Sequence, residues 1–138
     1  MRCKNNFVTY PETKEAGVYA IVNKTRKKVY IGESQNIRSR AKAHINLLKS
    51  GKHYCEELQK DYDNNHKMEI VEVYIVSNSY DCDTRLCMED FYIACLQQKG
   101  IELYNNPRDK NCKDNFFIYA SRLDKNVYNI LRKMNRVQ

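Results

Sequence analysis

Three stretches of the chain are rich in β-branched and aromatic residues and are short enough to be β-strands. The first two, residues 18–22 and 28–31, flank a polar segment, which predicts a β-hairpin. The third, residues 68–76, is the most continuously apolar run, so we expect it to lie deep in the sheet. The pattern therefore predicts a three-stranded antiparallel sheet.

Between and after these strands, apolar residues recur at helical spacing. The first such helix has Ser34 as its expected N-cap and ends near Gly51, and its apolar side is formed by Ile37, Ala41, Ile45 and Leu48. A short helix over 54–65, a helix over 84–99 that is apolar on nearly all sides, and a C-terminal helical stripe follow. The chain should thus adopt an α+β, sandwich-like fold in β-β-α-α-β-α order, with helices flanking the sheet and one further helix at the C-terminus.

The length of 138 residues predicts one domain over 1–138. No run is long and apolar enough for a membrane span, and the N-terminus has no signal-peptide core, so we expect no membrane partner and no secretion. Six cysteines without a secretion signal suggest reduced thiols, and their spacing disfavours a zinc site. These features predict a cytoplasmic protein, or a nuclear one in a eukaryote, and leave the oligomeric state open.

The net charge of +7 is unevenly distributed along the chain. Residues 24–53 contain nine Lys or Arg residues and one acidic residue, Glu33. Residues 54–105 contain more acidic than basic residues, and residues 106–138 are basic again. A solvated face is the simplest interpretation of any one basic run. The charge density within 24–53 nevertheless favours a phosphate-backbone partner, while the acidic middle argues against a protein that coats nucleic acid on all sides.

Several short motifs occur in order along the chain: Gly17-Val18-Tyr19, Tyr30-Ile31-Gly32, Arg40, His44, Glu89 and Tyr104-Asn105. Arg40 lies ten residues after Tyr30, and His44 lies four residues after Arg40. This set resembles the GIY-YIG nuclease superfamily, with a spacing closest to the catalytic domains of phage intron-encoded homing endonucleases. The resemblance covers the core over 17–105 and leaves 106–138 as a basic C-terminal helical extension.

The resemblance implies a set of catalytic residues: Tyr19, Tyr30, Arg40, His44 and Asn105. It also implies that Glu89 binds a divalent metal ion, Mg²⁺ or Mn²⁺; the alternative for Glu89 is an ion pair with a core arginine. The alternative for Asn105 is a plain turn residue before Pro107. Both tyrosines are implicated in activating water, and the sequence does not decide between them. The preferred assignment has Tyr19 orienting the water and Tyr30 taking its proton.

Basic residues near the motifs are expected to contact nucleic-acid phosphates: Lys28, Arg38, Lys42, Lys49 and His53. At about 100° per residue, Arg40 and His44 share one flank of the first helix, so Arg40 is the candidate for the scissile phosphate. The other basic residues of that helix lie on the opposite flank. His53 is equally consistent with a local hydrogen bond. Glu33 departs from the family pattern, since some relatives carry a Lys near the phosphate at this position. A carboxylate there would repel phosphate unless it faces a Lys or Arg or joins the metal site.

These observations predict a metal-dependent endonuclease that hydrolyses phosphodiester bonds of DNA, most readily duplex DNA. The alternative is a catalytically silent nucleic-acid-binding module of the same fold, and a third hypothesis is a basic protein-interaction domain. The biological role, whether homing, restriction, repair or mobility of an element, is not indicated by the sequence.

Overall fold

The computed structural model describes residues 6–7, 9–106 and 120–134. Its sheet has four strands in the order β3-β1-β2-β4. These are β1 (Ala16–Asn23), β2 (Lys28–Ser34), β3 (Met68–Val76) and β4 (Glu102–Leu103). The central strand β1 is antiparallel to both β2 and β3, whereas β4 pairs in parallel with the first two residues of β2.

The three predicted strands are antiparallel to one another as expected, but the predicted strand number is wrong, because a fourth, parallel strand makes the sheet a mixed one. The missed strand, β4, has only two residues, and such a length carries no hydrophobic alternation that a sequence pattern could reveal. The predicted element order is otherwise confirmed, with β4 inserted before the last helix.

The turn of the hairpin between β1 and β2 is closed by hydrogen bonds between the Asn23 side chain and the backbone of the turn. The Asn23 side-chain oxygen accepts hydrogen bonds from the backbone amides of Thr25 and Arg26, at 3.0 and 2.9 Å. Lys27 completes the turn with a left-handed backbone, at φ 62°. This turn sets the register in which Tyr19 of β1 lies directly opposite Gly32 of β2.

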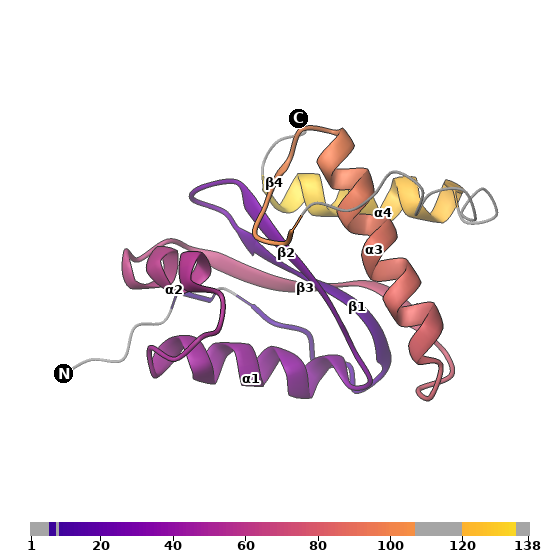
Figure 1. Ribbon diagram of the computed structural model, residues 1–138, viewed down its shortest axis with the longest axis horizontal. Coiled ribbons are helices and arrows are strands. Elements are labelled where there is room, and N and C mark those ends of the chain that lie inside the picture. The colour runs from indigo at the N-terminus through magenta and orange to yellow at the C-terminus, as the bar shows by residue number, and fades with distance from the viewer. Residues whose placement is uncertain (1–5, 8, 107–119, 135–138) are drawn as a thin grey trace.

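Helices cover both faces of the sheet (Figure 1). On one face lie α1 (Ile37–Lys49) and α2 (Glu56–Asp63), with α3 (Cys82–Gln98) and α4 (Ala120–Lys133) on the other. Alternate residues of β1 point to opposite faces: Tyr19 and Ile21 join the core under α1, whereas Val18 and Ala20 join the core under α3. None of the helices in the described part of the chain is long and apolar enough to cross a membrane.

Two details of the helices differ from the sequence prediction. The N-cap of α1 is Asn36 and not Ser34, because the Asn36 side chain accepts from the Ser39 amide at 3.0 Å. Ser34 instead donates its hydroxyl to the Asn36 carbonyl. Helix α3 is buried along one broad side and exposes Leu86 and Cys87, so it is less enclosed than its composition suggested.

The glycines of the two motifs are required by close packing. A Cβ at Gly17 would overlap the carbonyl group of Tyr74 on β3. A Cβ at Gly32 would overlap the ring and hydroxyl of Tyr19, which folds across its cross-strand partner. A bulge at Val18/Tyr19 in the β1–β3 ladder lies beside this contact. Glycine at position 32 therefore creates the space in which the Tyr19 phenol lies.

We expect Gly32→Ala to lower the free energy of unfolding by about 1–3 kcal/mol, because the new methyl group overpacks a fully enclosed phenol. Urea denaturation measures the loss. Gly51→Ala is the matched comparison: Gly51 has open space but a φ of 74°, so its cost should be about 1 kcal/mol, from backbone strain alone. A Gly32→Ala protein as stable as the unaltered chain would contradict the packing argument.

Candidate active site

The Tyr19 phenol meets His44 of α1 beneath the sheet. The Tyr19 hydroxyl lies 2.6 Å from His44 Nε2, and both side chains are almost completely buried. The ring of Tyr30, from the neighbouring strand, packs edge-on against the His44 ring at 5.5 Å. The structure thus brings together three of the residues predicted to be catalytic, from two strands and a helix.

His53 continues this contact into a chain of hydrogen bonds. His44 Nδ1 lies 2.8 Å from His53 Nε2, and His53 Nδ1 accepts from the Cys55 backbone amide at 3.0 Å. Burial lowers the pKa of His44 to about 3, with smaller contributions from His53 and Arg40. Burial also lowers the pKa of His53. Both rings are therefore neutral at neutral pH.

The backbone amide of Cys55 assigns the tautomers of both neutral rings. Because His53 Nδ1 accepts, its proton is on Nε2 and is donated to His44 Nδ1. The His44 proton is then on Nε2 and is donated to the Tyr19 oxygen. It follows that the Tyr19 hydroxyl accepts from His44 and keeps its own proton free to point elsewhere.

A third tyrosine, which the sequence analysis did not single out, completes the cluster. The Tyr54 hydroxyl lies 3.1 Å from the Tyr30 hydroxyl, and the Tyr54 ring stacks on His53 at 4.4 Å. Tyr54 stands in the loop between α1 and α2, although the sequence predicts that a helix begins at residue 54. Its only signal in the sequence was its position directly after His53.

The charge of Glu89 affects the pKa of both phenols, and the charge of Arg40 affects the pKa of Tyr19. Burial raises the pKa of Tyr30, and the Tyr54 hydrogen bond and the Glu89 charge raise it further. Burial also raises the pKa of Tyr19, to which Tyr30, Tyr54 and Glu89 add, while the Arg40 charge opposes them. Glu89 reaches these groups from α3, which covers the opposite face of the sheet. The charge of Arg40, on α1, and that of Glu89, on α3, therefore both affect the Tyr19 phenol.

Glu89 is the candidate ligand for a hard divalent cation. It is half-buried, and its charge adds to the raised pKa of the Tyr19 and Tyr30 phenols. Within the described residues no group of three or more His, Cys, Asp or Glu side chains could enclose a metal ion. An ion here would be held by one carboxylate, water and substrate oxygens, which is the arrangement that Mg²⁺ accepts.

Asn105 holds the strand that carries Tyr30. Its side-chain oxygen accepts from the Ile31 amide at 2.8 Å, and its side-chain nitrogen donates to the Ile31 carbonyl at 2.7 Å. This pair of bonds extends the β2 edge beyond the short strand β4. Asn105 is thus bonded to the residue that follows Tyr30 in β2, and it supports the position of the strand that carries the phenol.

The charge of Glu33 is balanced by an arginine. Arg85 Nε donates to the Glu33 carboxylate at 3.0 Å, and Arg85 also donates to the Ser79 carbonyl at 2.6 Å. Arg85 is buried and lies one turn before Glu89 on α3. The departure from the family pattern at Glu33 is therefore compensated within the fold.

The residues predicted to bind nucleic acid do not form one surface. Lys28 is buried, and its Nζ lies 2.6 Å from the Glu57 carboxylate and over the Tyr104 ring, so it is not available to a phosphate backbone. His53 lies inside the aromatic cluster. Lys42 and Lys49 are exposed on the flank of α1 away from Arg40, where Arg38 also lies at the edge of the helix.

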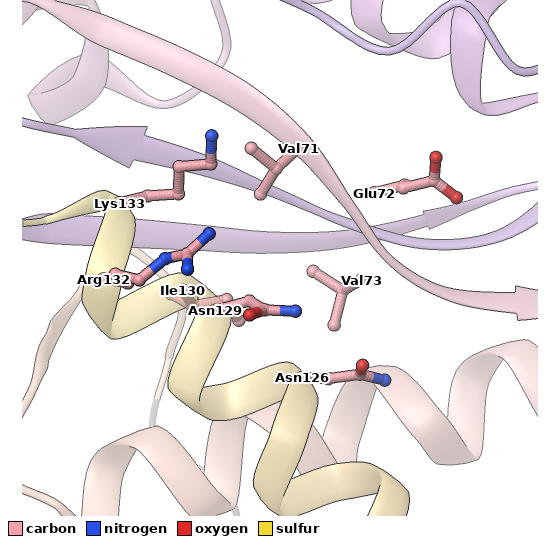
Figure 2. Close-up of a pocket in the computed structure, with 8 residues that line it drawn as sticks. All are labelled: Val71, Glu72, Val73, Asn126, Asn129, Ile130, Arg132 and Lys133. Atoms are coloured by element: carbon pink, nitrogen blue, oxygen red, sulfur yellow. The ribbon is translucent and has the colours of Figure 1, made fainter.

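A separate cavity of about 190 Å³ lies between β3 and α4 (Figure 2). It combines apolar side chains with amides and charges: Val71, Glu72, Val73, Asn126, Asn129, Ile130, Arg132 and Lys133. Lys133 also forms an ion pair with the buried Glu69 at 3.0 Å. None of the predicted catalytic residues lines this cavity, so it is distinct from the phenol cluster.

Comparisons with known proteins agree with this geometry. Residues 15–102 match the family model described as the GIY-YIG catalytic domain. The fold is similar to the structure of the catalytic domain of homing endonuclease I-TevI, with 24% identity over 67% of this chain and 100% of that chain, and a TM-score of 0.58.

A Glu-to-Ala mutant of the same intron endonuclease domain matches with 26% identity over 64% of this chain and 90% of that chain, at a TM-score of 0.56. A search of curated proteins finds no match. Since the family model spans more than half of the residues, and its two signature tripeptides are the ones that form the phenol cluster, the chain belongs to the GIY-YIG family.

Proposed function

We propose that this protein is a metal-dependent endonuclease that hydrolyses phosphodiester bonds of DNA. The observation that carries the proposal is the convergence of Tyr19, Tyr30 and His44 with the charges of Arg40 and Glu89. Membership of the GIY-YIG family and the likeness to an endonuclease catalytic domain support it. The basic α1, with Lys42 and Lys49 exposed, supports a polyanionic substrate.

Phosphodiester hydrolysis needs three contributions: an activated water, neutralisation of charge on the phosphoryl oxygens, and help for the leaving oxygen. A divalent cation, Mg²⁺ or Mn²⁺, supplies charge stabilisation and help for the leaving oxygen when bound. Glu89 would hold it. Arg40 is exposed on α1, where its charge acts on Tyr19, and it would bind the phosphate through its planar array of donors.

Tyr30 is the better placed of the two phenols to take the proton from water. Tyr19 is 2 % exposed and its oxygen already accepts from His44, whereas Tyr30 is only half-buried. In this assignment Tyr19 orients the attacking water through its free O–H, and His44 keeps Tyr19 in position as a neutral donor. Tyr30 must be ionised to act as a base, so its environment sets the pH dependence.

A catalytically silent nucleic-acid-binding module of the same fold is the second candidate. The one observation that favours it is the exposure of the lysines of α1. Such a module would bind DNA with an affinity that falls steeply as salt rises, and would leave the DNA intact with either Mg²⁺ or Mn²⁺. Incubation of the purified protein with duplex DNA and each ion, followed by denaturing electrophoresis, separates the two candidates.

We expect Glu89→Gln to reduce DNA cleavage by at least about a hundredfold, because the amide cannot hold the cation that stabilises the phosphoryl charge. Binding to DNA should be unchanged in a titration without metal. Asp90→Asn is the matched control, since Asp90 is the adjacent half-buried carboxylate of α3, and it should cleave normally. Loss of binding together with cleavage in Glu89→Gln would identify a structural glutamate instead.

We expect the cleavage rate at saturating Mg²⁺ to rise with pH from neutral to alkaline, by about tenfold per pH unit where proton abstraction limits the rate. The sign follows from burial, Tyr54 and Glu89, which raise the pKa of Tyr30 and keep it protonated at neutral pH. Tyr30→Phe should lower the rate by about 10²–10⁴-fold. Tyr128→Phe, at an exposed position of α4, should leave the rate unchanged. A rate that does not change with pH would contradict a phenol base.

A further inference from the structure

We infer that Tyr54 contacts the substrate of the proposed nuclease site by stacking its ring on a nucleobase beside the scissile phosphate. This inference rests on the proposed function and specifies its substrate. The DNA would need an unpaired or unstacked base next to the bond that is cut. Tyr54 is not one of the motif residues that define the site. It is argued from its ring, its loop and its hydroxyl group.

The Tyr54 ring is the outermost member of an aromatic cluster built around His44. Its ring lies 4.4 Å from that of His53, nearly parallel at 27°, and 5.9 Å from that of His44. His44 is 1% and His53 6% exposed, whereas Tyr54 is 59% exposed. One face of Tyr54 is thus supported by a buried ring while the rest of the side chain meets solvent.

The loop that presents Tyr54 is held by the backbone amides of Lys52, His53 and Cys55. The amides of Lys52 and His53 donate to the Leu47 carbonyl and to the Gln59 side chain, at 2.9 and 3.1 Å. The Cys55 amide donates to His53 at 3.0 Å. A ring fixed in this way loses little conformational entropy when a ligand stacks on it, which is the condition for an efficient binding residue.

The hydroxyl of Tyr54 places the exposed ring next to the chemistry. It lies 3.1 Å from the hydroxyl of Tyr30, the proposed base. A phosphate bound at Tyr30 therefore carries its flanking nucleotide across the Tyr54 ring. Every nucleobase has an aromatic face, and stacking on tyrosine requires that this face be free of its neighbours in the strand. Tyr80, which precedes α3, and Tyr128, on α4, are exposed tyrosines outside this cluster and serve as contrasts.

The absence of tryptophan from the chain allows a direct test. In a full-length Tyr54→Trp protein, we expect the indole emission to be quenched when a mixed-sequence single-stranded DNA binds in the presence of EDTA. Tyr128→Trp, which places the reporter on α4, should keep its emission at the same saturation. Binding itself is followed by the anisotropy of a labelled copy of that DNA, and circular dichroism verifies the fold.

Two further variants separate stacking from hydrogen bonding. Tyr54→Leu should weaken binding of the single-stranded DNA by about tenfold, while Tyr54→Phe, which keeps the ring, should bind within about twofold of the unaltered chain. Equal affinity in Tyr54→Leu, or saturated binding without quenching in Tyr54→Trp, would overturn the inference.

The test also distinguishes this inference from the proposed function. Quenching and weakened binding without any cleavage in Mg²⁺ would leave the stacking role intact and remove the nuclease activity. Cleavage by the unaltered chain combined with unaffected Tyr54 variants would remove only the stacking role. Failure of the unaltered chain to bind DNA would overturn both.

Discussion

The contact between Tyr19 and Gly32 is the constraint on which the site depends. The two residues are partners across the β1–β2 hairpin, and the phenol occupies the space that a side chain at position 32 would fill. From there the Tyr19 hydroxyl reaches His44 at 2.6 Å and joins the sheet to α1 through a buried hydrogen bond. A change in hairpin register by one residue would turn Tyr19 to the opposite face and separate it from His44.

The electrostatics of the cluster follow from its burial. Both imidazoles are held neutral, and the hydrogen-bond chain that starts at the Cys55 amide makes His44 Nε2 the donor to Tyr19. Burial raises the pKa of both phenols, and Glu89 adds a smaller contribution in the same direction, so both hydroxyl groups are neutral at neutral pH. Under the proposed function, a cation at Glu89 would reverse that effect, so that metal binding and ionisation of the base favour each other.

Polar contacts away from the phenols keep the supporting strands in place. Asn105 pairs with both backbone groups of Ile31, and the neighbouring Tyr104 lies in a network with Asn23 and Asp61 at the turn of the hairpin. Arg85 neutralises Glu33 at the other end of β2. These contacts hold β2 at both of its ends, and the strand bearing Tyr30 is therefore firmly positioned.

The sequence by itself determined the elements whose residues repeat at a fixed interval and the motifs whose spacing is local. The hairpin, the third strand and the helices follow from hydrophobic spacing, and the motifs point to Tyr19, Tyr30, Arg40, His44 and Glu89 as one candidate set. The structure brings Tyr19, Tyr30 and His44 into contact, while the chemical roles of all five stay predictions.

Only the tertiary structure decided which side chains meet across long separations. It added β4 and paired Glu33 with Arg85, which lies 52 positions later in the chain. It also paired Lys28 with Glu57 and placed the Tyr54 hydroxyl against that of Tyr30. A sequence shows which side chains are charged or aromatic. It does not show which of them are buried or which residues they contact, because both depend on how the two faces of the sheet are covered. That is why the sequence predicts that Lys28 contacts DNA, whereas in the structure Lys28 is buried and pairs with the exposed carboxylate of Glu57.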